Sequence, residues 1–374
     1  MYIRKLEKTI KKLLFMEKVI ILYGPRQVGK TTLVKKIFDE YQGEKLYIQC
    51  DVPSQAFFVS KPEPEALKKY FGNAKLVILD EAQVIENIGL VLKTFFDAYK
   101  DIQIIATGSS SFDLANKIRE PLTGRAFELM LYPLSVAEII DTKNRSHYLS
   151  NQNNYFQYGM YPGIIDEGMK TSIQSLEILQ NNTFYKDIFA LENIKKPKVL
   201  QDLIKYLAFT IGSVVTTNNL ANEIKTTAVT IERYLDILEK MFVIKRLYSY
   251  SNNKTSEIKK GYKVYFIDIG IRNSIINNFN SHEARDDAGG IFENFFFVER
   301  LKKRKYDTIF SNIHFWQGER GLEVDYVEEL NGTLIAYECK IKNRKSKGVQ
   351  MFKKLYPKAE LHVVTLENYL DFVI

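Results

Sequence analysis

One stretch near the N-terminus constrains the fold of this chain more than any other feature. Residues Gly24-Pro25-Arg26-Gln27-Val28-Gly29-Lys30-Thr31-Thr32 contain the pattern G-x-x-x-x-G-K-[S/T]. The stretch follows the apolar run Val19–Tyr23, which is typical of a strand buried on both faces, and it opens a segment with helical periodicity. Its glycines allow backbone N–H groups to converge on a phosphate, and the positive end of the helix points at the same anion. We therefore expect a nucleotide site here, with Lys30 on the β- and γ-phosphates and Thr31 on Mg²⁺.

Further short apolar runs at residues 46–50, 76–79 and 102–106 alternate with helical segments such as 88–99. This alternation predicts an α/β fold with a parallel sheet and helices on both of its faces. Asp80 and Glu81 end the second of these runs, where Asp80 can hold the metal and Glu81 can polarise an attacking water. Thr107 and Ser109 end the third run; their hydroxyls either sense the γ-phosphate or cap the strand.

The chain changes character after about residue 140. Residues 141–198 are mostly helical in pattern and predict a lid or linker. Residues 199–280 show three helices followed by a two-stranded ribbon, which is the pattern of a winged helix. Residues 281–374 show a helix, three strands, a helix and a strand. With residues 1–140, this gives four expected parts.

A second group of charged residues flanks the hairpin signal Asn331-Gly332. A two-residue turn at this position pairs Asp325 with Glu338 and places Lys340 on the same face. Opposed carboxylates need a positive charge between them, so we expect a second Mg²⁺ or Mn²⁺ there, with Glu293 as a further member. A solvated charged face is the alternative.

Five motifs in order support a resemblance over residues 19–136. They are Gly-Pro-Arg-Gln-Val-Gly-Lys-Thr-Thr-Leu, Leu-Asp-Glu-Ala-Gln, Ala-Thr-Gly-Ser-Ser, Leu-Thr-Gly-Arg and Tyr-Pro-Leu-Ser. The chain resembles the bacterial and archaeal AAA-superfamily ATPases that carry a C-terminal domain of unknown function. The resemblance implies ATP hydrolysis, and it implies that Arg125 faces a phosphate in its own subunit or in a neighbour's, although a structural salt bridge would also explain this arginine.

The C-terminal residues Asp325, Glu338 and Lys340 are similar to the motif of the PD-(D/E)xK nuclease superfamily. This resemblance covers residues 289–366, and it departs from the usual pattern because no proline precedes the aspartate. It implies a restriction-endonuclease-like domain that either cuts nucleic acid with a metal ion or keeps the fold and only binds.

Composition narrows the class of partner. The net charge of +8 mildly favours anionic partners, and basic residues gather at 300–305 and 340–358. Two cysteines exclude a disulfide framework, and no apolar run is long enough to span a bilayer, so we expect a cytoplasmic protein. Two hypotheses remain. One is an ATP-driven switch coupled to DNA or RNA binding or cleavage; the other is a regulatory switch acting on a protein partner. A homo-oligomer is compatible with both.

Overall fold

The computed structural model describes residues 1–61, 63–108, 122–182, 194, 196–251, 261–341 and 346–374. The chain forms two compact units. The first comprises residues 1–134 with 240–242, and the second comprises residues 135–239 with 243–374. The first boundary therefore lies after Leu134, slightly before the predicted position at residue 140.

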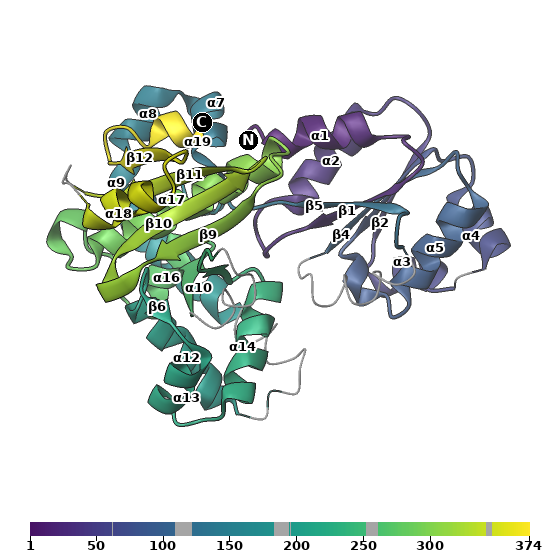
Figure 1. Cartoon of the computed structure of the whole chain (residues 1–374). Coiled ribbons are helices and arrows are strands. Elements are labelled where there is room, and N and C mark those ends of the chain that lie inside the picture. The colour runs from purple at the N-terminus through teal and green to yellow at the C-terminus, as the bar shows by residue number, and fades with distance from the viewer. Residues whose placement is uncertain (62, 109–121, 183–193, 195, 252–260, 342–345) are drawn as a thin grey trace. The chain divides into compact units, whose positions relative to one another are not determined.

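The first unit is built on a five-stranded sheet with the order β2-β3-β4-β1-β5, in which all neighbouring strands are parallel (Figure 1). Its strands and helices, in chain order, are α1 (Lys5–Leu13), β1 (Val19–Tyr23), α2 (Lys30–Glu40), β2 (Lys45–Gln49), α3 (Pro53–Val59), α4 (Pro64–Phe71), β3 (Leu76–Asp80), the 3₁₀ helix η1 (Ala82–Val84), α5 (Ile88–Ala98), β4 (Gln103–Gly108) and β5 (Ala126–Met130).

Helices cover both faces of this sheet, because its central strands are apolar throughout. Val19, Ile21 and Tyr23 of β1 share a core with residues of α4 and α5. Ile20 and Leu22 are equally buried but point to the opposite face, since side chains alternate along a strand. Helix α2 lies on that opposite face (Figure 1). The predicted α/β fold with a parallel sheet is confirmed.

The second unit begins with helices and continues into a small antiparallel sheet of order β6-β8-β7. Its elements up to residue 284 are α7 (Val136–Lys143), α8 (Arg145–Ser150), α9 (Gln152–Tyr158), α10 (Met169–Asn181), α12 (Pro197–Phe209), β6 (Val214–Val215), α13 (Thr217–Glu223), α14 (Ala228–Lys240), β7 (Ile244–Tyr248), β8 (Tyr262–Phe266), α16 (Ile269–Ile275) and η3 (His282–Ala284). Three helices followed by the antiparallel pair β7 and β8 occur in the order expected for residues 199–280; their assignment as a winged helix stays a prediction.

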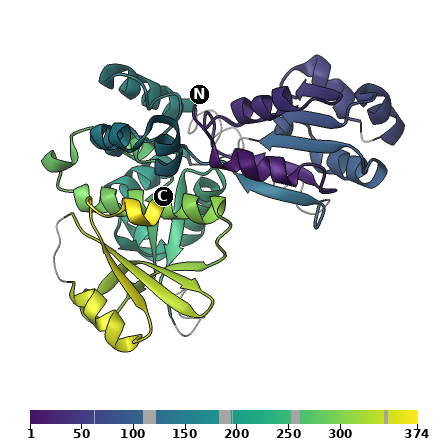
Figure 2. The same cartoon turned by 90° about the horizontal axis from the view of Figure 1, so that it is seen from above.

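The remainder of the second unit holds a four-stranded sheet of order β12-β11-β10-β9. Its elements are α17 (Ala288–Tyr306), β9 (Asn312–Gln317), η4 (Glu319–Gly321), β10 (Glu323–Leu330), β11 (Thr333–Cys339), α18 (Lys347–Leu355), β12 (Glu360–Val364) and α19 (Leu370–Val373). The short helix α19 lies beside α17 (Figure 2). None of the helices in the described ranges combines the length and apolar composition needed to cross a bilayer.

The hairpin between β10 and β11 has the predicted register. Tyr326 pairs with Tyr337 and Leu330 with Thr333, as the two-residue turn requires. Asn331 and Gly332 both have positive φ, 50° and 79°, which is the geometry that such a turn needs. The pairing of β10 with β9 contains a bulge between Val324 and Val327, so the backbone around Asp325 departs from a regular ladder.

The glycine-rich turn that follows α9 supports the start of α16. Gly159 has φ 75°, and a Cβ built on it would lie 2.0 Å from Oδ1 of Asp268. That carboxylate accepts hydrogen bonds from the backbone of Met160, Gly270 and Ile271, so it caps α16 and fixes the turn at once. The turn is therefore structural.

We predict that Gly159→Ala lowers the free energy of unfolding of the second unit by about 3 kcal/mol, because it adds both backbone strain and a steric overlap. Gly163→Ala is the matched control, since nothing lies within 4 Å of a Cβ at Gly163. Urea unfolding followed by circular dichroism measures both variants. Equal stability of the two variants would contradict the assignment.

Candidate functional site

The loop between β1 and α2 has the backbone of a phosphate-binding loop. Gln27 and Gly29 have positive φ values of 61° and 95°, and α2 begins directly after them. Gly24 passes so close to β5 that a Cβ would lie 2.3 Å from the carbonyl oxygen of Leu131. Left-handed residues next to a helix N-terminus turn successive N–H groups toward one point, which makes an anion-binding concavity.

Lys30 is buried at the start of α2, with 4% of its surface exposed. Its Nζ donates to the carbonyl oxygens of Gly24 and Pro25, each at 2.9 Å. The ammonium is thus held across the loop, where phosphate oxygens can replace the carbonyls as its partners. The other residues of the predicted loop differ in exposure: Pro25 and Val28 are buried, Thr31 is partly buried, and Arg26 and Thr32 are exposed.

Asp80, the last residue of β3, is buried and accepts hydrogen bonds from three hydroxyls. Thr31 donates from α2 at 2.8 Å, Tyr47 from β2 at 2.7 Å and Thr107 from β4 at 2.5 Å. Burial and the Asp80 charge raise the pKa of Tyr47, so this phenol remains a donor. The structure therefore brings the predicted metal residues Thr31 and Asp80 together, and it adds Tyr47, which the sequence pattern did not single out.

The donor set at this position fits Mg²⁺, which prefers hard oxygen ligands. Asp80 would hold the ion, directly or through its water shell, together with the Thr31 hydroxyl. Glu81 follows with φ 55°, and its backbone N–H donates to Oγ1 of Thr107 at 3.0 Å. This left-handed step turns the chain sharply at the end of β3. The side-chain amide of Gln83, in the same turn, donates to the Glu81 carboxylate.

Thr107 differs from the expected γ-phosphate sensor. Its hydroxyl is fully buried, donates its single hydrogen to Asp80 and accepts from the backbone of Glu81. Thr107 therefore positions the two acidic residues. Ser109 lies outside the described residues.

Arg125 lies at the wrong end of the sheet to face a phosphate in its own subunit. It directly precedes β5, whose first residue pairs with Val19, whereas the phosphate loop follows Tyr23 at the other end of β1. The two ends of β1 are about 13 Å apart at the usual rise of a strand. The Arg125 Nε donates to Asp97 at 3.2 Å, which is the structural salt bridge considered as the alternative. A role toward a neighbouring subunit stays a prediction.

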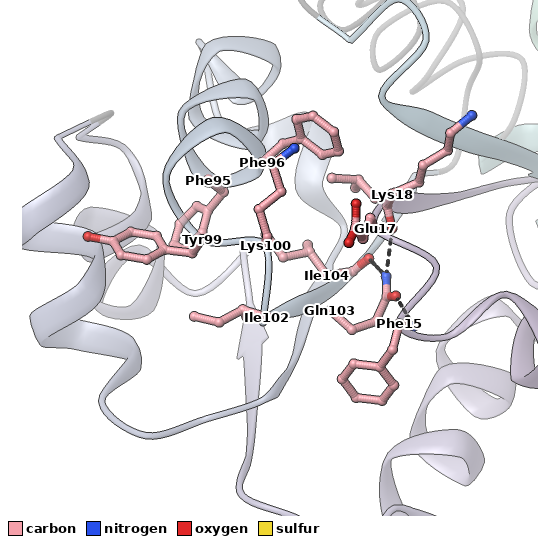
Figure 3. Close-up of a pocket in the computed structure, with 11 residues that line it drawn as sticks. Phe15, Glu17, Lys18, Phe95, Phe96, Tyr99, Lys100, Ile102, Gln103 and Ile104 are labelled. Atoms are coloured by element: carbon pink, nitrogen blue, oxygen red, sulfur yellow. Dashed lines mark hydrogen bonds between the residues drawn. The ribbon is translucent and has the colours of Figure 1, made fainter.

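A pocket at the end of the sheet where Arg125 lies is too small to hold a nucleotide (Figure 3). Its volume is about 20 Å³, which is room for a water molecule. Gln103 lines this pocket. The Gln103 side chain donates to the carbonyl of Lys18 and accepts from the backbone N–H of Phe15. These bonds fix the chain that leads into β1.

The predicted C-terminal residues do gather in the second unit. Nζ of Lys340 lies 2.8 Å from Glu338, and the Asp325 charge acts on Glu338, whose pKa is raised by burial first and by Asp325 next. Glu293, from α17, belongs to the same group, because burial and the charge of Asp325 raise its pKa to about 8.

A lysine that the sequence pattern did not single out lies between these carboxylates. Lys263 of β8 is completely buried, and its Nζ lies 2.8 Å from Glu293, 3.3 Å from Asp325 and 3.6 Å from Glu323. Tyr265 also donates to Glu293, at 2.6 Å. Among the residues that the structure describes, no three His, Cys, Asp or Glu side chains are arranged to hold a metal ion. The second Mg²⁺ or Mn²⁺ was expected between Asp325 and Glu338. In the structure Lys263 pairs with Asp325 and Lys340 pairs with Glu338, so each of these carboxylates already has an ammonium partner.

The basic run at 300–305 is largely internal. Arg300 forms two hydrogen bonds to Glu328, Lys302 binds Glu299, and Arg304 donates to Ser311; all three basic side chains are buried. The interpretation of this run as a surface for phosphates is wrong for these three residues. In the second run, Lys342, Arg344 and Lys345 lie outside the described residues, and four exposed lysines on or near α18 remain: Lys347, Lys353, Lys354 and Lys358.

The acidic face of α14 is also used internally. Glu232, Asp236 and Glu239 all form ion pairs with the buried Arg246 of β7. These contacts attach α14 to the small sheet and explain why the third helix carries acidic residues.

Family models match three successive stretches of the chain. Residues 16–140 match the model of an AAA domain family. Residues 149–282 and 288–371 match two domains of unknown function, DUF8612 and DUF4143.

Three related proteins, all described as uncharacterized, are similar over most of the chain. One from Haemophilus influenzae is 25% identical over 76% of this chain and 74% of its own length. One from Methanocaldococcus jannaschii is 26% identical over 95% and 82%, and one from Mycobacterium tuberculosis is 23% identical over 86% and 70%.

Solved structures show only distant likeness. A signal transduction ATPase with numerous domains and a tetratricopeptide repeat sensor, from Pyrococcus horikoshii, has a TM-score of 0.32 and 13% identity. The match covers 81% of this chain and 46% of that protein. The Drosophila origin recognition complex bound to AT-rich DNA and Cdc6 gives a TM-score of 0.27 and 11% identity, over 73% of this chain and 90% of that chain.

The raised pKa of Glu293 predicts a pH dependence of stability. The unfolded carboxyl titrates near its ordinary value of about 4.3, whereas the folded one titrates at about 8. The folded state therefore binds this proton more tightly. The associated stability is fully present below about pH 4.3 and is lost as the pH rises through about 8.

Glu293→Gln removes this titration, so we expect the variant to gain stability relative to the wild type between pH 5 and pH 8, on the order of 1–4 kcal/mol. Urea unfolding at both pH values measures the gain. The control, Glu283→Gln at an exposed position, should track the wild type. A stability difference between Glu293→Gln and wild type that does not change with pH would contradict the expectation.

Proposed function

We propose that the first unit binds ATP with Mg²⁺ and hydrolyses it, and that the nucleotide state acts as a switch on the rest of the chain. One observation carries the proposal: Asp80 is bound at once by the phosphate loop's Thr31 and by Thr107, which also holds the backbone of Glu81. The match of residues 16–140 to an AAA domain supports it.

Each residue has a distinct task in this proposal. The N–H groups of the loop and the N-terminus of α2 bind the β- and γ-phosphates, and Lys30 exchanges its two carbonyl partners for phosphate oxygens. Thr31 and Asp80 would hold Mg²⁺, which supplies charge neutralisation on the phosphates. Glu81 accepts a proton from the attacking water and orients it. Thr107 fixes the carboxylate of Asp80 and the backbone of Glu81, which preorganises this end of β3.

The proposed roles of Lys30 and Glu81 can be separated by mutation. Lys30→Ala should lose nucleotide binding, because the loop loses its cation. Glu81→Gln should keep ATP affinity while turnover falls by about 10²–10⁴-fold, since only the base is lost. Fluorescent-nucleotide binding and phosphate release measure the two properties.

Glu86→Gln serves as the matched control, because Glu86 is exposed a few residues further along the same turn. Its turnover should equal that of the wild type. Normal turnover in Glu81→Gln would remove the base from this position.

We propose that the switch acts on a protein partner rather than on nucleic acid. The buried basic residues of 300–305 and the acidic face of α14 are both engaged inside the second unit. Neither segment is thus free to line a phosphate backbone. Cleavage by the C-terminal sheet is not part of the proposal, because Lys263 pairs with Glu293 and Asp325, and Lys340 pairs with Glu338.

Nucleic-acid binding remains the second candidate because of the exposed lysines on and near α18. Fluorescence anisotropy with a DNA duplex, at several salt concentrations and with ATP or ADP, tests it. We expect weak binding that does not depend on the nucleotide. ATP-dependent binding with a steep salt slope, reduced in a Lys353→Ala/Lys354→Ala variant, would favour nucleic acid instead.

A further inference from the structure

The surroundings of Lys263 differ from those of a lysine at a protein surface. The side chain leaves β8, within the small sheet, and ends among carboxylates that come from two other elements, α17 and β10. None of its surface is exposed. An ammonium is buried in this way only when its charge is compensated, because an unpaired buried charge is strongly destabilising.

The carboxylates of Glu293 and Asp325 compensate that charge. Oε1 of Glu293 accepts from both Lys263 and Tyr265, at 2.8 Å and 2.6 Å. Asp325 accepts from Lys263 through Oδ1 at 3.3 Å and from the backbone N–H of Cys339 through Oδ2 at 2.9 Å. Lys340 binds Oε1 of Glu338, whereas Oε2 of Glu338 is buried and has no hydrogen-bond partner among the described residues. Both oxygens of Asp325 therefore accept a hydrogen bond.

An aromatic ring on a third element favours an ammonium over a metal ion. Nζ of Lys263 lies 5.7 Å from the centre of the Phe315 ring on β9. Such a ring attracts an ammonium through its quadrupole, but it gives Mg²⁺ or Mn²⁺ no ligand oxygen. A divalent ion also needs its oxygens at about 2.0–2.1 Å, and a lysine between the same carboxylates would repel it.

Burial alone would lower the pKa of Lys263, but the charges of Glu293, Asp325 and Glu323 outweigh that effect and raise it. The charged form of the side chain is therefore favoured at this buried position.

We infer that Lys263 is the built-in cation of the C-terminal carboxylate site, so that this site binds no divalent metal and hydrolyses no phosphodiester. The ammonium instead joins β8 of the small sheet to α17 and β10. A backbone bridge between Ser249, which follows β7, and Phe315 of β9 also connects the small sheet to the four-stranded sheet. This assignment is independent of ATP binding in the first unit.

Removal of the ammonium should convert the site into a metal site. In Lys263→Ala, Glu293 and Asp325 lose their shared cation, and a hard divalent ion can replace it. The test is a Mn²⁺ titration of the nucleotide-free full chain, followed by electron paramagnetic resonance of free Mn²⁺.

We expect wild type and Asp325→Asn to bind Mn²⁺ identically, so that any background binding lies elsewhere. Lys263→Ala should gain one additional ion, bound at least tenfold more tightly than this background, and Lys263→Ala/Asp325→Asn should lose it. The control Lys340→Ala should gain none, because Lys340 contacts only the Glu338 side of the group. Mn²⁺ should also raise the melting temperature of Lys263→Ala more than that of the wild type.

Two results would overturn the inference. One is a Mn²⁺ ion in the wild type that Asp325→Asn removes, and the other is a folded Lys263→Ala protein that gains no ion. Lys263→Met, which keeps the apolar length of the side chain, replaces Lys263→Ala if the alanine variant does not fold. The comparison of wild type with Asp325→Asn shows by itself whether the native site binds a metal ion, so this part of the test needs neither lysine variant.

Discussion

The buried carboxylate of Asp80 is the interaction on which the first unit's site depends. Its three hydroxyl donors come from α2, β2 and β4, and Asp80 itself ends β3. One side chain thus connects four elements at the carboxyl edge of the sheet. Ligands of open parallel sheets bind at this edge, because loops and helix N-termini meet there. Any change in the spacing of these strands would move the loop, the metal residues and Glu81 together.

The second unit uses buried charge in a different way. Lys263 compensates Glu293 and Asp325, Arg300 compensates Glu328, and Lys302 compensates Glu299. A buried ion pair contributes little net stability, but removal of one partner costs several kcal/mol. The pairs of Lys263 and of Arg300 connect different elements, so they specify how those elements join more than how strongly they hold. Several charged residues that suggest a catalytic group or a phosphate surface in the sequence, among them Glu293, Arg300 and Lys302, are here parts of the interior.

Local features of the sequence predicted much of this structure. The phosphate loop was identifiable because strand, loop and helix are contiguous, and the register of the β10–β11 hairpin followed from Asn331-Gly332 alone. The features that sequence could not give depend on three-dimensional neighbours. Lys263 meets Asp325 across 62 positions of chain, and its only local signal was a lysine inside the apolar run Tyr262–Phe266. The end of the sheet at which Arg125 lies depends on how β5 pairs with β1. The sequence predicted that Thr107 lies at the end of its strand. It did not predict that the Thr107 hydroxyl donates to Asp80.

ATP turnover by the full chain, measured as a function of Mg²⁺ concentration, tests whether Asp80 organises a Mg²⁺-dependent ATPase site. We predict that wild-type turnover rises to saturation with Mg²⁺. In Asp80→Asn, shown by circular dichroism to be folded, turnover should fall by at least about 100-fold at every Mg²⁺ concentration. A folded Asp80→Asn protein with the turnover and Mg²⁺ dependence of the wild type would contradict this role of Asp80, as would a wild-type protein that binds ATP but shows no turnover at saturating Mg²⁺.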